Sequence, residues 1–283
     1  MTVIADLARP LFFERNVTLS HGLRTKSAFD LALYPAMGRR DVGVLIATVI
    51  GVVEFIDGEE QYEYEVYKKK FPDLVAPASQ FFNPAFPRKW GAGEKQVFIS
   101  EGNAIVSRVW SGRHILTPSN DMTEMKKIHV QVDCHLKQGW GLHSHWNVAV
   151  KKYPPFYKTR SFVRAGTAGA IDNGEVNLNM IDIYPEDLGG PTKFVTIAHE
   201  FGHVLGMRDE YLEGTVPADV PWFVSDTASI MNRGNVVRPR HYVLFATWLD
   251  KAFRNGTLLR GLTPGWRVGE FPPFTTVANA GIG

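Results

Sequence analysis

Cysteine is almost missing from this sequence. Cys134 is the only one in 283 residues, so an intramolecular disulfide is excluded. A single cysteine fits a reducing compartment, although secreted proteins can also do without disulfides. With 45% hydrophobic and 21% charged residues, the composition is that of an ordinary globular protein with enough apolar side chains for a sizeable core.

Long apolar runs and an excess of one charge are missing too. The longest apolar stretch, Val42–Phe55, is too short to span a bilayer and is rich in β-branched residues, which favours a buried strand. The N-terminus has no basic region followed by a long apolar core, as a conventional signal peptide would. The net charge is +2 without a long basic stripe, which argues against nucleic acid as a partner. We therefore expect a soluble protein, either cytoplasmic or exported without a conventional signal peptide.

Residues 1–90 form a β-rich region in this interpretation, accessory to the rest of the chain or part of the same domain. The best strands there are Val42–Phe55 and the alternating Gln61–Tyr67. The segment Ala76–Lys95 carries three prolines and two glycines and is the best candidate for a linker or long surface loop.

Residues 91–283 are expected to form an α+β domain, because a helix, a series of strands and a second helix follow one another. The helix is expected at Glu94–Trp110. The strands are expected at Lys127–Leu136, His145–Tyr153, Ser161–Gly166 and Gly174–Ile183. A break at Asp187–Thr192 separates the last strand from the second helix, and a further helix is one interpretation of Val243–Phe253.

The second helix contains the stretch TIAHEFGHVLGMRDEY. Pro191 or Thr192 is expected to start it, as a proline in the first turn or as a capping side chain. At about 100° per residue its apolar side chains form one stripe, made of Phe194, Ala198, Phe201 and Leu205. The opposite sector holds Thr196, His199, Glu200 and His203. An ordinary surface helix would expose the side opposite its apolar stripe, whereas this helix is expected to be buried over most of its circumference and to keep these polar residues on one face.

His199 and His203 are four residues apart, so both imidazoles can reach one metal ion. Glu200 is rotated away from that ion but can contact a water beside it. This arrangement is typical of zinc hydrolysis: the metal lowers the pKa of its water, and the adjacent carboxylate accepts the proton. The alternative is a buried helix whose histidines are simply hydrogen-bonded.

Gly206 follows His203 by three residues and suits a left-handed helix C-cap that lets the chain turn back. The return can bring a third ligand to the ion. The spacing favours Asp209 as that ligand, with Glu210 as the fallback, because a loop can absorb one residue of slippage. Tyr211 is interpreted as a packing residue.

The segment HEFGHVLGMRD fits the pattern HExxHxxGxxD, which resembles the motif of the metzincin zinc peptidases with aspartate in place of the third histidine. It is similar to the snapalysin-like branch, in which this replacement is known. The resemblance covers residues 199–234, because it also implies that Met231, in TASIMNRG, belongs to a Met-turn beneath the metal. It implies one catalytic Zn²⁺, a twisted and mostly parallel sheet, and an active-site helix.

The same resemblance suggests further roles. In several metzincins a tyrosine just after the Met-turn contacts the metal or the oxyanion, and His241 or Tyr242 is the candidate here; a helix N-terminus leading into Val243–Phe253 is the alternative. An edge strand that binds an extended peptide is placed by analogy at Ala170–Met180. Cys134 is interpreted as a buried structural thiol and not as a cysteine switch.

The sequence thus predicts a zinc metalloendopeptidase that acts on a protein or peptide substrate. The motifs also resemble bacterial metallopeptidase effectors of contractile secretion systems. Two alternatives remain open: a zinc scaffold that binds without catalysis, and a zinc amidase acting on cell-wall peptides. A second metal site at His143 and His145 is a further alternative, against a plain polar turn. No oligomeric state is predicted.

Overall fold

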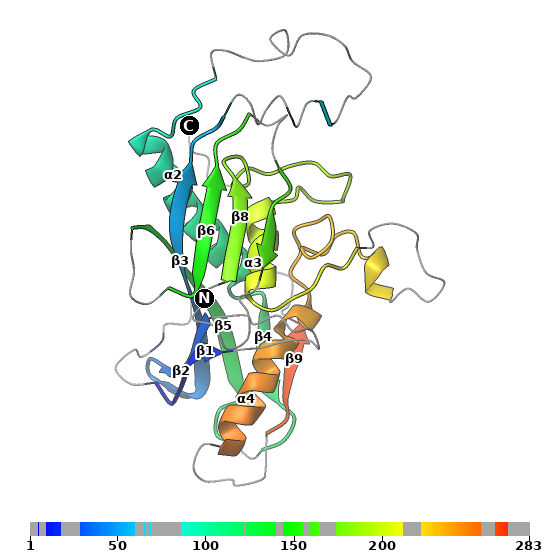
Figure 1. The fold of residues 1–283 in the computed structure, drawn as a ribbon. Helices are drawn as coiled ribbons and strands as arrows, with labels where there is room; N and C mark the ends of the chain where they lie inside the picture. The colour runs from blue at the N-terminus through cyan, green and yellow to red at the C-terminus, as the bar shows by residue number, and fades with distance from the viewer. Residues whose placement is uncertain are drawn as a thin grey trace, which may run out of the picture.

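The structure, a computed structural model, describes residues 10–17, 29–59, 86–121, 123–139, 144–154, 159–164, 174–211, 222–255 and 264–270, with the single residues 5, 65, 68 and 69. Its centre is one mixed sheet (Figure 1). The strands are β1 (Phe12–Val17), β2 (Phe29–Ala36), β3 (Arg39–Ile56), β4 (His114–Pro118), β5 (Lys127–Gln138), β6 (Trp146–Lys151), β7 (Phe162–Arg164), β8 (Gly174–Asn179) and β9 (Trp266–Glu270).

The sheet has the strand order β7-β8-β6-β3-β5-β4-β9, with β2 pairing to β3 and β1 to β2. Its four central strands, β8, β6, β3 and β5, run parallel to one another. The outer pairs, from β1 to β3 and at β4 and β7, are antiparallel. The molecule is therefore a mixed α/β structure with a mostly parallel central sheet, which is compatible with the predicted α+β class.

Strand β3 organises the sheet because its β-branched run is long enough to pair on both sides. Leu45, Ala47 and Val49 are fully buried on one face, whereas the residues between them are only half-buried. Parallel pairing joins β3 to β5 and to β6. Strands from residues 1–90 and from the remainder of the chain consequently belong to one sheet.

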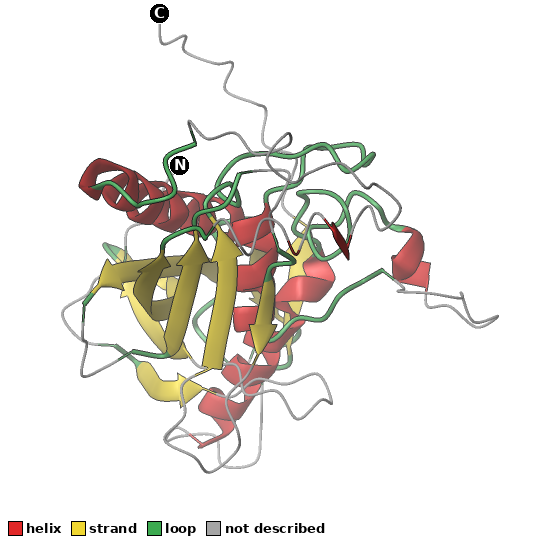
Figure 2. Cartoon of the chain, turned by 45° about the horizontal axis from the view of Figure 1, so that its top comes forward, coloured by secondary structure: helices red, strands yellow, loops and turns green. Residues whose placement is uncertain are grey.

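The helices are α2 (Ala92–Trp110), α3 (Thr196–Val204) and α4 (Val243–Asn255), with short 3-10 helices η3 (Trp222–Ser225) and η4 (Pro239–Tyr242). Helix α2 packs on β5 and contacts α3, while α4 packs on β9. Figures 1 and 2 show α2 and α3 behind the same face of the sheet. Helix α3 is thereby enclosed between the sheet and the loops that follow it.

The predicted start of α3 is wrong. The helix begins at Thr196 with Val195 as its N-cap, and not at Pro191 or Thr192. Phe194 donates to Glu186 O (2.8 Å) and accepts from Glu186 N (2.7 Å). This bridge holds the chain extended until just before the helix, so the proline and threonine lie in the preceding turn.

Three other sequence predictions differ from the structure or are only partly described by it. Of the predicted strand Gln61–Tyr67 only Glu65 is described, and it is helical, in keeping with the good helix propensity of glutamate. Residues 76–85 of the predicted linker lie outside the described residues, and its last residues, from Ala92, already belong to α2. Within the predicted edge strand Ala170–Met180, the described residues from Gly174 on contain β8, which is not at the edge: it pairs with both β6 and β7, and β7 forms the edge.

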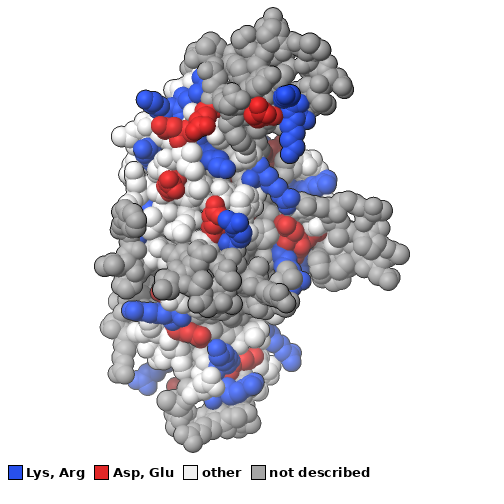
Figure 3. Space-filling model, viewed as in Figure 1, with Lys and Arg blue, Asp and Glu red and all other residues white. Residues whose placement is uncertain are grey.

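The surface carries both charges. On the face drawn in Figure 3, Lys and Arg side chains alternate with Asp and Glu side chains over the described residues, and they form no extended patch of one sign there. Among the residues that the structure describes, no helix has the length and apolarity needed to cross a membrane.

Candidate metal centre

Helix α3 is buried on nearly all sides, as its sequence predicts. Its eight buried residues include His199 and Glu200, which are only 4% and 5% exposed. At its start Ile197 N donates to Asp182 O (3.0 Å). In its middle the Trp110 indole donates to Ala198 O (2.8 Å). These contacts fix the helix against the turn that follows β8 and against the last residue of α2.

The end of α3 is a Schellman motif. Gly206 has φ 95° and donates to His203 O (2.9 Å), while Met207 N donates to Gly202 O (2.9 Å). A residue with a side chain is strained at such a φ, which explains the glycine. The predicted left-handed C-cap at Gly206 is therefore confirmed, and it turns the chain back towards the polar face of the helix.

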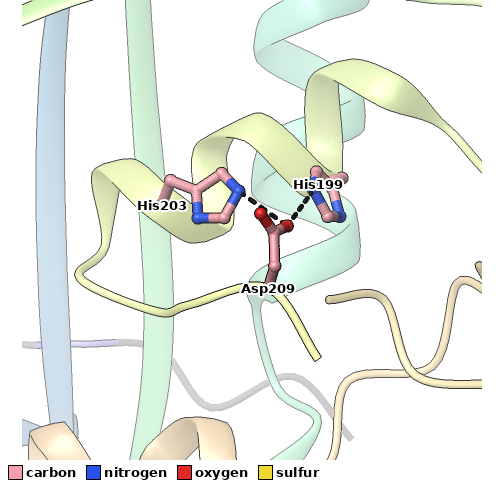
Figure 4. Close-up of side chains that lie close together, drawn as sticks. All are labelled: His199, His203 and Asp209. Atoms are coloured by element: carbon pink, nitrogen blue, oxygen red, sulfur yellow. Dashed lines mark ion pairs between the residues drawn. The ribbon is translucent and has the colours of Figure 1, made fainter. Parts of the chain in front are cut away.

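The return brings Asp209 between the two histidines (Figure 4). Its Oδ1 lies 3.1 Å from His199 Nε2 and 3.2 Å from His203 Nε2. The three side chains each offer one ligand atom, and all of these atoms lie within 4.8 Å of one another. The structure thus contains a His199–His203–Asp209 group that could hold a metal ion, in the combination expected from the sequence.

The outer ring nitrogens fix the orientation of both imidazoles. His199 Nδ1 lies 2.7 Å from Ile230 O, and His203 Nδ1 lies 2.9 Å from Met207 O. A carbonyl only accepts, so each Nδ1 carries a proton and the Nε2 of a neutral ring presents a lone pair. Two lone pairs directed at one carboxylate repel it. Either protons on the imidazoles or a shared cation makes this geometry favourable.

In the metal-free protein the charges of these groups depend on one another. Burial raises the pKa of the Asp209 carboxyl, but its hydrogen bonds with His199 and His203 outweigh burial and lower that pKa below its ordinary value. Burial lowers the pKa of His203, but Asp209, the Met207 carbonyl and Glu200 together raise it above its ordinary value. Asp209 is therefore an anion at neutral pH. It favours either a proton on an imidazole or a cation bound between the two rings.

Glu200 lies beside this group without belonging to it. Its Oε2 is buried and has no hydrogen-bond partner among the residues that the structure describes. Burial raises the pKa of Glu200, and the nearby His199 and His203 oppose that increase. A buried carboxylate left without a partner costs free energy unless a ligand or water uses it, which is the situation expected of a general base.

Residues 229–236 form a turn that lies against α3. Met231 is fully buried and packs on Gly202, where an added Cβ would lie closer than 3.0 Å to the Met231 sulfur. The preceding residue, Ile230, provides the carbonyl that accepts from His199. This turn therefore supports the helix beneath its histidines, which is where the sequence resemblance places Met231.

Glu210 is occupied elsewhere. Arg240 donates to both of its carboxylate oxygens at 2.6 Å, and His241 Nε2 lies 3.2 Å from Oε1. Burial raises the pKa of Glu210, but Arg240 and His241 lower it to about 2. Among the two neighbouring acids, the geometry selects Asp209 as the residue that approaches the histidines.

His241 and Tyr242, the residues suggested for a catalytic role after the Met-turn, are both buried and have other partners. His241 is bonded to Glu210 and accepts from Arg238 N (3.0 Å). The Tyr242 hydroxyl donates to Trp110 O and is fully buried. Both residues connect α4 to the rest of the core, in keeping with the alternative of a helix start.

Tyr211 takes a position that the sequence did not reveal. Its ring stacks on His199 with 6.3 Å between ring centroids and 26° between planes, and its hydroxyl lies 3.5 Å from Arg160 Nη2. The side chain is half-buried. The only signal was its position two residues after Asp209, which is too weak to separate a site residue from a packing residue.

The histidine considered for a second metal site and the single cysteine both lie in surroundings typical of structural residues. His145 accepts from Ile50 N at Nδ1 (3.0 Å), and its Nε2 lies 3.1 Å from Asp30 Oδ1, while His143 lies outside the described residues. Cys134 is a buried free thiol, as predicted, and burial raises its pKa strongly. A raised pKa disfavours the thiolate that a metal ligand requires.

Comparison with known proteins adds no relative: no family model matches the chain, and no curated protein or solved structure does so either.

Proposed function

We propose that this chain is a zinc-dependent endopeptidase that hydrolyses peptide bonds, with His199, His203 and Asp209 as metal ligands and Glu200 as general base. One observation carries the proposal. Two imidazole nitrogens and a carboxylate oxygen lie within 4.8 Å of one another. The helix that carries both histidines also carries a buried carboxylate, Glu200, one oxygen of which has no hydrogen-bond partner in the described part of the chain.

The donor set fits zinc. Zinc binds histidine nitrogen and carboxylate oxygen at about 2.0–2.2 Å, so tetrahedral ligands lie about 3.3–3.6 Å apart. The distances from Asp209 Oδ1 to the Nε2 atoms of His199 and His203, 3.1 and 3.2 Å, are close to that spacing. Both rings direct Nε2 inward and are held at Nδ1 by a carbonyl, which is the usual outer contact of a zinc-bound histidine. Three protein ligands leave one position open, as in catalytic sites.

The residues divide the chemistry among them. When bound, zinc supplies a Lewis acid that lowers the pKa of a water and polarises a carbonyl. Glu200 accepts the proton of the attacking water at its buried Oε2 and returns it to the leaving amine. Its raised pKa suits this exchange, because proton transfer is most effective when the pKa of the base lies near the working pH.

Tyr211 is the best placed donor for the developing oxyanion in this proposal, in place of His241 and Tyr242. Its ring is held by His199 and its hydroxyl is directed to the exposed Arg160. A hydrogen bond that forms in the transition state contributes more to rate than one formed equally with the substrate. An extended peptide would bind along β7, whose outer edge pairs with no other described strand.

Glu200→Gln tests the proposal because it keeps the shape of the side chain and removes the base. We expect it to retain zinc and to cleave casein about 100- to 10,000-fold more slowly. Asp209→Ala should lose both zinc and activity. Undiminished cleavage by Glu200→Gln would refute the mechanism.

The same preparations separate the alternatives. A wild-type protein that holds zinc but cleaves neither casein nor peptidoglycan would be a binding scaffold. Cleavage of peptidoglycan without cleavage of casein would identify a cell-wall amidase. Zinc content, measured by elemental analysis, is the common reference for all variants.

A further inference from the structure

Glu210, the acid beside the ligand Asp209, uses every polar group it has on one segment of the chain. Its N–H donates to Met231 O (2.8 Å), and its carbonyl accepts from the Asn232 amide (3.1 Å). Its carboxylate accepts twice from Arg240 and lies 3.2 Å from His241. All of these partners belong to residues 231–241, in the supporting turn (residues 229–236) and in η4.

The chain is also fixed on the other side of Asp209. Met207 donates to Gly202 O and its carbonyl accepts from His203 (both 2.9 Å). Only Arg208 and Asp209 lie between the anchor on α3 and the anchor on the supporting turn. The position of the Asp209 carboxylate therefore depends on the distance and angle between these two anchors.

The second anchor is itself braced. Arg240 also donates to Asp226 (2.7 Å), which in turn accepts two hydrogen bonds from Arg238 at 2.9 and 2.6 Å. Bidentate arginine–carboxylate pairs are directional as well as strong. Glu210 is 7% exposed, so solvent screens its pair with Arg240 only weakly.

We propose that the Glu210–Arg240 pair is a positioning device that holds Asp209 at the distance at which it can share a metal ion with His199 and His203. The proposal rests on the function proposed above. A short aspartate side chain has little reach, so a shift of its backbone by a fraction of an ångström moves the carboxylate out of place. Neither Glu210 nor Arg240 contacts the metal or the substrate in this role.

Zinc affinity of Glu210→Gln and Arg240→Lys, measured by competition with a chromophoric chelator, tests the proposal. Each variant keeps most of the side-chain volume and loses the charge-assisted fork. We expect the dissociation constant to rise about 10- to 100-fold, the usual effect of losing an outer contact of a metal site. The visible spectrum of the Co²⁺-substituted protein should change in the same variants, because it reports ligand geometry.

Glu94→Gln is the matched control. It weakens another ion pair of a buried side chain, Glu94 with Lys152, which shares no residue with the network that braces Glu210. By the same reasoning we expect its zinc dissociation constant to stay within about threefold of the wild-type value. Its Co²⁺ spectrum should not change. Thermal unfolding of the metal-free proteins shows how far each change acts on stability alone.

Two results would overturn the proposal. Wild-type affinity in both Glu210→Gln and Arg240→Lys would show that Asp209 needs no such support. Equal loss of affinity in all three variants, in proportion to their lost stability, would show a general structural role. A wild-type chain without zinc affinity would instead refute the proposed function itself.

Discussion

Met231 packs directly against Gly202, in the turn of α3 between His199 and His203. An added Cβ on Gly202 would lie within 3.0 Å of the Met231 sulfur and 2.9 Å from a ring carbon of Trp110. A glycine inside a helix is ordinarily unfavourable. Here it allows the supporting turn to approach the helix closely, so that Ile230 O reaches His199.

Gly202→Ala should therefore destabilise the protein by about 1–3 kcal/mol, the range for overpacking in a full core. The methionine has to move, and with it the carbonyl that orients His199. Urea unfolding of the metal-free protein measures the loss. Gly93→Ala in α2 is the control: its Cβ meets nothing within 4 Å, so this change should stabilise slightly. Equal stability of the two variants would contradict the packing argument.

Removing the hydroxyl of Tyr211 should affect catalysis, whereas removing the hydroxyl of Tyr242 should affect stability. Tyr211→Phe removes a hydroxyl beside the ligand group, so kcat should fall about 10- to 1,000-fold while stability changes little. Tyr242→Phe removes the donor to Trp110 O in the core. It should lower the free energy of unfolding by about 1–3 kcal/mol and leave kcat nearly unchanged.

Peptide hydrolysis and thermal unfolding of both variants measure this contrast. A large loss of kcat in Tyr242→Phe at unchanged stability would restore the role that the family resemblance suggested for it. Zinc content should stay at the wild-type level in both variants, because neither hydroxyl belongs to the proposed ligands His199, His203 and Asp209.

The central strands and the ligand helix could be predicted because their signals are local. The β-branched run of β3 and the apolar stripe of α3 both follow from side-chain periodicity. The start of α3 could not be predicted in this way. Thr192 and Pro191 are good helix starts locally, but the bridge of Phe194 to Glu186 is a tertiary contact, and it keeps that segment extended.

The residues of the site also divide into those that local spacing predicts and those that depend on distant partners. His199 and His203 follow from one helical turn, and the glycine-terminated return favours Asp209 as the third residue but leaves Glu210 open. Choosing between Asp209 and Glu210 required Arg240, thirty residues away in the sequence. The burial of Tyr242 depended on Trp110 in α2. Long-range partners of this kind leave no periodic trace in the sequence.

His145 should make stability depend on pH. Burial lowers its pKa, and the neighbouring Asp30 only partly opposes that. The unfolded chain then binds a proton near pH 6.5 while the folded protein resists it, so stability falls as pH falls below about 6.5. One such group contributes a slope of at most about 1.4 kcal/mol per pH unit.

His145→Asn isolates this contribution, because its side-chain oxygen can still accept from Ile50 N. Subtracting the stability curve of the variant from that of the wild type between pH 8 and 5 removes the effects of the other two histidines whose pKa burial lowers, His129 and His241. The difference should shrink towards acid as the wild type loses its advantage. Parallel curves would mean that His145 carries no linkage.

In the proposed function, zinc joins the two histidines of α3 to the loop that carries Asp209, and it should therefore stabilise the folded protein. At free zinc about 100 times the dissociation constant, binding to the folded state alone contributes about 2.7 kcal/mol. A chelator should therefore lower Tm of the wild type and of Glu200→Gln, which keeps all three ligands. It should leave Asp209→Ala unaffected, since that variant lacks the residue that connects loop to helix. A Tm that is independent of chelator in a zinc-loaded wild type would mean that the ion is held away from this group, and the assignment of His199, His203 and Asp209 would fail with it.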